Sequence, residues 1–124
     1  MPAIPTAAGR ATAGAATDRA GAAVADAELM RARAALAAVH RAIDGGAYDF
    51  DDERDAERGH AALAGALLAL AAVPSRTPAG AAEKLEAYVR QFYRSGGDLG
   101  TKEEEALLRS VLRDLRRMAG GAAV

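Results

Sequence analysis

Paired glycines and prolines divide the chain into four segments, and each segment carries apolar residues at the spacing of an α-helix. The breaks fall at Gly45-Gly46, Pro74 with Pro78, Gly96-Gly97 and Gly120-Gly121. Glycine adopts the left-handed conformation that ends a helix at no steric cost, whereas proline removes a hydrogen bond from a helix interior. The punctuation therefore predicts an all-α fold with four helices.

The first predicted helix runs from about Asp18 or Asp26 to Ile43. Apolar residues recur along it at intervals of three and four, which places them on one side of a helix. They are Leu29, Ala32, Leu36, Val39 and Ile43. The helix ends at Gly45-Gly46, and its start stays open because Gly21 weakens the pattern.

The second predicted helix opens at Asp51 or Asp52, whose side chains can cap the first turn, and it ends at Val73 before Pro74. Its second half, HAALAGALLALAAV, is apolar on every side. A helix of that kind is buried on more than one side. We therefore expect it to be the central helix of the fold, with Gly59–Val73 as the most buried part of the chain.

The third and fourth predicted helices both begin at a threonine. Thr77 precedes Pro78, which suits the first helical position, and the apolar stripe that follows contains Leu85, Tyr88, Val89 and Phe92. Thr101, with Glu104 three residues later, forms a capping box. The last helix carries a stripe wide enough to contact two neighbours: Leu107, Leu108, Val111, Leu112, Leu115 and Met118. Gly120-Gly121 are expected to close it.

Short connections favour antiparallel neighbours, so the predicted architecture is an antiparallel up-and-down four-helix bundle over residues 18–119. The alternative is a three-helix core with the first helix loosely docked or swapped to a partner. Residues 1–17 are rich in alanine, glycine, proline and threonine and are predicted to form a disordered tail. Residues 120–124 are predicted to be a flexible C-terminus.

The core is expected to be thin. Alanine supplies most of the 51% of residues that are hydrophobic, and it buries little area. A thin core must offset an ordering cost of about 1–2 kcal/mol per residue, which leaves little margin for a monomer. We therefore expect a homodimer or larger assembly. The association surface is assigned to a strip of mostly small residues on the second helix: Ala61, Gly65, Leu68 and Ala69.

Composition narrows the classes of partner and compartment. The net charge of −1 gives no general attraction to nucleic acid or to an anionic membrane. The absence of cysteine excludes disulfides and thiolate zinc sites. The N-terminal stretch lacks the apolar region of a signal peptide, and no apolar run reaches the roughly 20 residues that span a bilayer. We expect a cytoplasmic protein without a membrane span.

Histidines and acidic residues are the candidates for a metal site. Glu57 and His60 have the Glu-x-x-His spacing of di-metal carboxylate bundles, but those sites need two such motifs, and His40 has no glutamate three residues before it. No register of the acidic connection 44–55 places calcium ligands at the EF-hand positions. We expect no metal or cofactor, His60 at the edge of the core, and Tyr48 and Phe50 folded back over the end of the bundle.

No enzyme motif is complete. Glu83 and Glu86 have the E-x-x-E spacing of helical nucleotide pyrophosphohydrolases, but a second acidic pair at the right spacing is missing from the next helix. The serines lack the local turn of a nucleophile, and the glycine pairs follow helices instead of preceding them. We expect no catalytic residues and a non-enzymatic protein.

Basic residues gather on the side of the last helix opposite its leucines: Lys102, Arg109, Arg113, Arg116 and Arg117. Such a face can follow phosphates or lie on a membrane. Yet acids fill the first turn and arginines the last two, which is the charge order that stabilises a helix by itself. Glu105 and Arg109 also have the favourable i,i+4 orientation. We interpret the face as solvated and keep nucleic acid or another polyanion as the alternative ligand.

The stretch from Thr77 to Leu85 (TPAGAAEKL) is similar to one that opens a helix in a loose group of short, uncharacterised helical proteins of GC-rich bacteria. The resemblance extends over residues 31–115 in helix order and loop positions. It implies a helical fold of bacterial origin and no assigned activity, so no functional residue carries over. The sequence thus predicts a protein that acts by self-association or by binding a protein partner, with polyanion binding through the last helix as the alternative.

Overall fold

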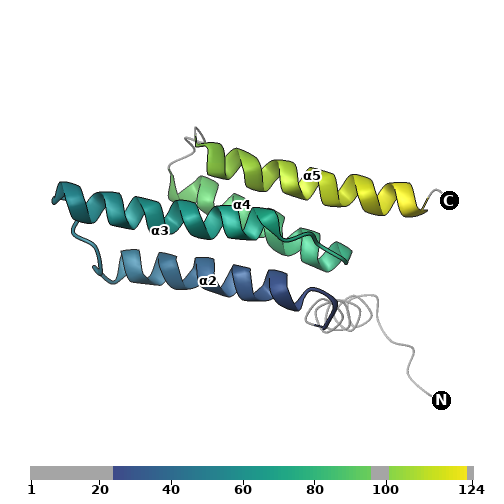
Figure 1. Cartoon of the computed structure of the whole chain (residues 1–124), viewed down its shortest axis with the longest axis horizontal. Coiled ribbons are helices and arrows are strands. Elements are labelled where there is room, and N and C mark those ends of the chain that lie inside the picture. The colour runs from purple at the N-terminus through teal and green to yellow at the C-terminus, as the bar shows by residue number, and fades with distance from the viewer. Residues whose placement is uncertain (1–23, 96–100, 123–124) are drawn as a thin grey trace, which may run out of the picture.

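The computed structural model describes residues 24–95 and 101–122, which form four α-helices (Figure 1). These are α2 (Ala27–Asp44), α3 (Glu53–Ala72), α4 (Pro78–Arg94) and α5 (Lys102–Ala122). Successive helices run in opposite directions and pack into one bundle, which confirms the predicted all-α fold. These residues contain no β-strand, and none of their helices combines the length and the hydropathy needed to cross a bilayer.

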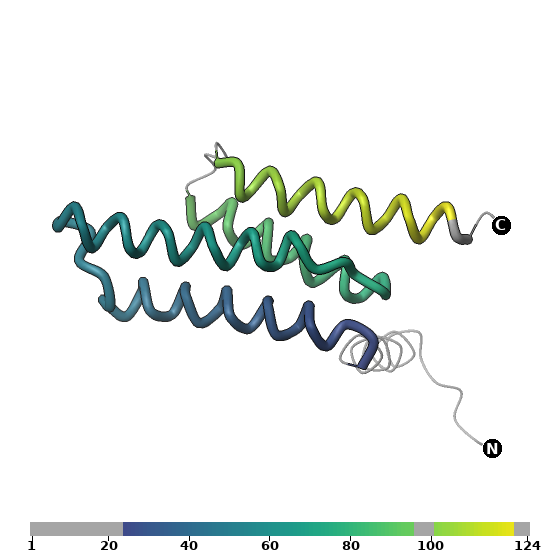
Figure 2. Tube along the Cα trace, viewed as in Figure 1, coloured from purple at the N-terminus to yellow at the C-terminus, as the bar shows by residue number. Residues whose placement is uncertain are grey.

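The helices surround the core in the order α2, α3, α5, α4, so α3 and α4 are not neighbours although they follow one another in sequence (Figure 2). α2 with α3 and α4 with α5 form antiparallel pairs, whereas α3 and α5 run in the same direction. α2 packs against α3 as extensively as α5 packs against α4, and only the α2–α4 contact is smaller. The alternative with a loosely docked first helix is therefore wrong.

Side chains at the expected positions cap α3 and α4. The Asp52 carboxylate accepts the backbone N–H of Asp55 at 3.0 Å, and the Thr77 hydroxyl accepts that of Gly80 at 3.0 Å. At the end of α2, Gly46 has a φ of 80°, the left-handed conformation that glycine supplies after a helix. The residues that begin α3 and α4 and end α2 are those that the sequence predicts.

The end of the last helix was predicted wrongly. α5 passes through Gly120-Gly121 and ends at Ala122, so these glycines do not close it. Glycine lowers helix propensity by about 1 kcal/mol but does not forbid helical torsion angles. Of the two starts predicted for the first helix, Asp26 is the residue that precedes α2. The other, Asp18, lies outside the described residues, as do the predicted tail 1–17 and Gly96-Gly97.

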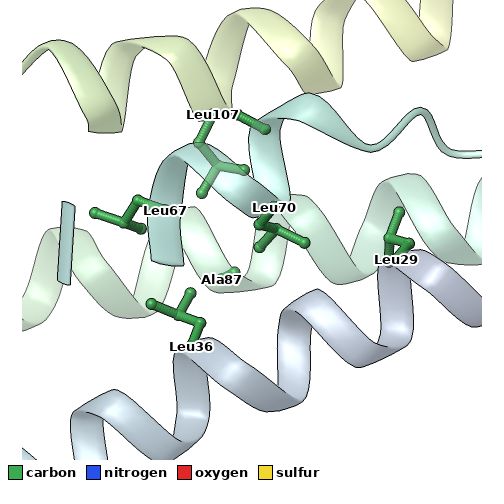
Figure 3. Packing of buried hydrophobic residues seen from close by; sticks show 7 residues of the cluster. Leu29, Leu36, Leu67, Leu70, Ala87 and Leu107 are labelled. Carbon is green, nitrogen blue, oxygen red and sulfur yellow. The ribbon is translucent and has the colours of Figure 1, made fainter. Parts of the chain in front are cut away.

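A small leucine cluster forms the centre of the bundle (Figure 3). Its leucines come from α2, α3 and α5 and are at most 2% exposed: Leu29, Leu36, Leu67, Leu70 and Leu107. α4 contributes only Ala87 to this cluster. The core of the described chain is thus as thin as the composition implies, and α4 faces it mainly with small and polar side chains.

α3 is not the most buried helix. Within Gly59–Val73, the buried positions are Gly59, Leu67, Leu70 and Ala71. The opposite side of the helix, which includes Ala61, Gly65, Leu68 and Ala69, is exposed because α3 packs against α2 and α5 only. The expectation that this segment lies centrally is wrong, because an apolar sequence on every side does not by itself supply a neighbour for every side.

A buried carboxylate joins the start of α2 to the start of α4. Asp26 is 3% exposed, and its oxygens accept the backbone N–H groups of Arg76 at 2.5 Å and Thr77 at 3.2 Å. The same carboxylate accepts the Thr77 hydroxyl at 2.7 Å. A Cβ at Gly80 would lie 2.8 Å from the Asp26 carboxyl carbon, so only glycine leaves room for this contact.

Candidate functional site

The apolar stripe of α4 lies largely outside the core. Leu85 and Val89 are each 42% exposed and Phe92 is 36% exposed. The buried side of α4 is instead made of small and polar residues: Gly80, Ala81, Lys84, Ala87 and Gln91. The apolar stripe predicted for this helix is therefore not its buried side, although Tyr88 of that stripe packs against the leucine cluster. The tight α4–α5 contact admits alanine and glycine better than leucine, which turns the large side chains outward.

The broad stripe of α5 divides between core and surface. Leu107 and Val111 are buried, whereas Leu108, Leu112 and Leu115 are between 40% and 46% exposed. One chain therefore covers only half of this stripe. The stripe is predicted to be wide enough for two neighbours, and α5 does pack against two helices, α3 and α4.

The exposed apolar residues of α4 and α5 lie on the same side of the seam between the two helices. Lys84 of α4 contacts Asp114 of α5, and Leu85 and Leu115 each follow these contact residues by one position. One residue turns a helix by about 100°, and in antiparallel helices this turn leads to the same side of the seam. We name this the α4–α5 apolar surface: Leu85, Val89, Phe92, Leu108, Leu112 and Leu115.

Two ion pairs, each within a single helix, involve residues that are neighbours in sequence of the α4–α5 apolar surface. Glu86 and Arg90 on α4 are 2.7 Å apart, and Glu105 and Arg109 on α5 are also 2.7 Å apart. Tyr93, which is 76% exposed, packs edge-on against Phe92. Large apolar side chains beside locally compensated charges resemble the centre and rim of a protein interface.

The basic residues of α5 do not act as one free group. Arg109 pairs with Glu105, and Arg117 donates to the Ser75 carbonyl oxygen and lies 3.4 Å from Asp114. Arg113 and Arg116 form no ion pair with another described residue, and both line a groove between α3 and α5 together with Arg109. The fifth residue, Lys102, is exposed at the first turn of α5.

The strip that the sequence assigns to association is exposed on the outer side of α3. A Cβ added at Gly65 would meet no atom of another element within 4 Å, and Leu68 is 46% exposed. The strip contains no charged side chain, and Leu68 also lines the α3–α5 groove. Ala61, Gly65, Leu68 and Ala69 are thus brought to one open face.

A buried ion pair lies between α4 and α5, where sequence reasoning did not place one. The Lys84 ammonium donates to Asp114 and to the Ser110 hydroxyl, each at 2.7 Å. Ser110 in turn donates to the Ala71 carbonyl of α3 at 2.7 Å. Burial raises the pKa of Asp114, but hydrogen bonds from Lys84 and Ser75 outweigh it and hold the pKa below its usual range. The network joins three helices, and its three side chains, those of Lys84, Ser110 and Asp114, are at most 3% exposed.

A second polar chain crosses the other end of the bundle. The Gln91 side chain contacts His40 at 3.0 Å and Glu104 at 3.4 Å. Burial lowers the pKa of His40, although the hydrogen bond to Gln91 opposes the effect. The Glu104 backbone N–H donates to the Thr101 hydroxyl, which is one half of the predicted capping box. The Glu104 carboxylate turns inward to Gln91.

The histidines and the acidic connection are the sequence candidates for a metal site. No group of three or more metal-ligating side chains occurs in residues 24–95 and 101–122. His60 is exposed instead of lying at the core edge, and its ring centroid is 5.4 Å from that of Phe50. Phe50 and Tyr48 pack over Gly59, which confirms that both rings fold back over the end of the bundle.

Comparison of the chain with protein-family models, with curated proteins and with solved structures found no match.

Proposed function

We propose that this protein is a non-enzymatic helical protein that acts by association, first of all with a second copy of itself. The α4–α5 apolar surface carries the proposal, because six large apolar side chains on it are 36% to 46% exposed. Soluble monomers rarely leave apolar patches of this kind uncovered unless another molecule covers them.

A second copy fits this surface for two reasons. A two-fold axis brings the same patch of both copies together, so apolar side chains meet apolar side chains. The nearby charges form pairs within each helix, Glu86 with Arg90 and Glu105 with Arg109, so neither copy presents a net charge that repels the other. The thin core adds a need for further burial, since one chain buries few large side chains.

We expect the chain to sediment as a dimer at micromolar concentration. Changing Leu85 and Leu108 together to Gln should weaken the dimer at least about 100-fold, because each leucine is buried twice in a two-fold interface. Sedimentation equilibrium measures the dissociation constant, and circular dichroism checks that the variant is folded.

The matched control is Leu68→Gln, which changes a leucine of similar exposure that belongs to α3 and is not one of the six residues of this surface, and it should leave the dimer intact. A parent protein that sediments as a monomer, with a melting temperature independent of concentration, would contradict the proposal.

Polyanion binding through α5 is the second candidate function. It is favoured by Arg113 and Arg116, which are exposed and form no ion pair with another described residue. The internal contacts of Arg109 and Arg117 speak against it, because these two guanidinium groups already have partners.

We expect the parent and a variant with Arg109, Arg113 and Arg116 changed to Gln to elute from heparin at the same salt concentration. Equal elution is the behaviour of a solvated helix face. Loss in the variant of a clear, salt-sensitive retention shown by the parent would instead favour the polyanion function.

A further inference from the structure

A groove of about 670 Å³ runs between α3 and α5 on the outside of the bundle. Its apolar lining includes Leu68, Ala71 and Ala72 of α3 with Ala106 of α5. Leu112 of α5, which also belongs to the α4–α5 apolar surface, lines the groove as well, and the remaining lining residues are three arginines with no acidic residue among them. A molecule that binds here must therefore be apolar on the side that meets the groove and acidic where it meets the arginines.

The arginines form a row along the groove. Arg109, Arg113 and Arg116 are spaced by four and three residues, which places them on one side of α5. The lining of α5 from Ala106 to Arg116 extends about 15 Å at 1.5 Å per residue. This length suits a helix of about three turns lying along the groove.

The α3 side of the groove permits a close approach. Ala72 lines it, and the adjoining exposed positions Gly65 and Ala69 carry little or no side chain. Small residues let a neighbouring backbone come near, so an amphipathic helix can place its apolar stripe against Leu68 while its flank meets the arginine row. We propose that the α3–α5 groove binds an acidic amphipathic helix of another protein.

A second copy of this chain does not fit the groove. A two-fold arrangement would set the arginine rows of the two copies against each other, which is unfavourable. No described helix of this chain carries three acidic residues at spacings of four and three that would match the row. The sequence of residues 1–23 carries Arg10, Asp18 and Arg19, so it is not acidic either.

Nucleic acid is a poorer match than an acidic helix. No aromatic side chain lines the groove, so bases find no ring on which to stack. The apolar lining of the groove makes no favourable contact with a phosphate backbone. The internal ion pair of Arg109 with Glu105 does not block an acidic helix, because Arg109 is 76% exposed and surface pairs of this kind exchange at little cost.

The probe is a labelled 16-residue helical peptide with a leucine stripe and three glutamates in a row beside it. A second peptide has the same composition with leucines and glutamates dispersed around the helix. Fluorescence anisotropy should show the first peptide binding at least tenfold more tightly than the second. Changing Arg113 and Arg116 together to Glu should weaken its binding at least tenfold, and a lysine version of the peptide should regain affinity for that variant.

Two further variants separate this groove from the α4–α5 apolar surface. Leu68→Gln should weaken peptide binding at least tenfold and leave the dimer intact, because Leu68 lines the groove and is not one of the six residues of the α4–α5 apolar surface. Leu112 belongs to both and is unchanged in these variants. The Leu85 and Leu108 double variant should lose the dimer and keep the peptide. Absence of a dimer therefore does not contradict peptide binding in the groove, and absence of peptide binding does not contradict the dimer.

Three outcomes would overturn the proposal. The first is no binding of the acidic amphipathic peptide up to about 1 mM, the weakest affinity of interest. The second is equal binding of the dispersed peptide, which would reduce the groove to a charge effect. The third is tighter binding of a single-stranded oligonucleotide, which would assign the arginine row to phosphates.

Discussion

Replacing Lys84 with Met is expected to lower the free energy of unfolding by about 3 kcal/mol, the lower end of the cost of breaking a buried ion pair. The ammonium of Lys84 is fully buried and serves both Asp114 and Ser110. Without it the Asp114 carboxylate stays buried with an uncompensated charge. Arg117, at 3.4 Å from Asp114, offsets part of that charge and keeps the loss toward the lower end.

Urea denaturation at neutral pH measures this loss, and a double variant checks its cause. Changing Lys84 to Met and Asp114 to Leu together removes both charges, so most of the lost stability should return. Equal destabilisation in the single and double variants would mean that packing, and not the unpaired charge, explains the effect.

The pH dependence gives an independent check. In the parent the pKa of Asp114 is held low, so the stability that this carboxylate contributes is full above its unfolded pKa, near about 4, and is lost as the pH falls through the folded value. In Lys84→Met the buried Asp114 carboxylate has lost its lysine partner. Protonation of Asp114 at low pH removes that buried charge and restores part of the lost stability. The stability difference between parent and variant should therefore narrow in acid.

Two adjacent leucines should differ sharply in their contribution to stability. Leu67→Ala is expected to cost about 2–5 kcal/mol, because Leu67 is 2% exposed and lies in the central cluster. Leu68→Ala should change stability by less than about 0.5 kcal/mol, since Leu68 is 46% exposed on the far side of α3.

The pair makes its own control, because both substitutions have the same chemistry and nearly the same helix position. Denaturation of parent and variants must be compared at one protein concentration, since an associating protein gains stability by mass action. Similar losses at Leu67 and Leu68 would show that α3 is covered on both sides in solution.

The helix starts could be predicted because their causes are local. Asp52 and Thr77 accept backbone N–H groups a few residues ahead of them, and such a cap is visible in a short stretch of sequence. The end of α5 was missed for the same reason, because Gly120 and Gly121 weaken a helix without forbidding it.

The orientation of each helix could not be read in the same way. In α4 the stripe of large apolar residues and the stripe of small and polar residues both have helical spacing, and hydrophobicity alone points to the one that is mostly exposed. The position of Lys84 in line with Gly80, Ala81 and Ala87 was the available signal for a close helix contact with a buried cation. Its partner Asp114 falls in line with Leu107 and Val111 on α5, but nothing in the sequence joins the two stripes.

The Asp26 contact couples the start of α2 to the start of α4. Asp26 precedes α2, yet its carboxylate serves the N–H groups before α4, so two segments about 50 residues apart depend on one side chain. If α2 detaches, the start of α4 loses these hydrogen bonds, and if α4 unwinds, a buried carboxylate loses its donors. Partial opening at this end therefore costs free energy whichever of the two helices moves. We expect α2 and α4 to protect each other's backbone N–H groups from hydrogen exchange with solvent.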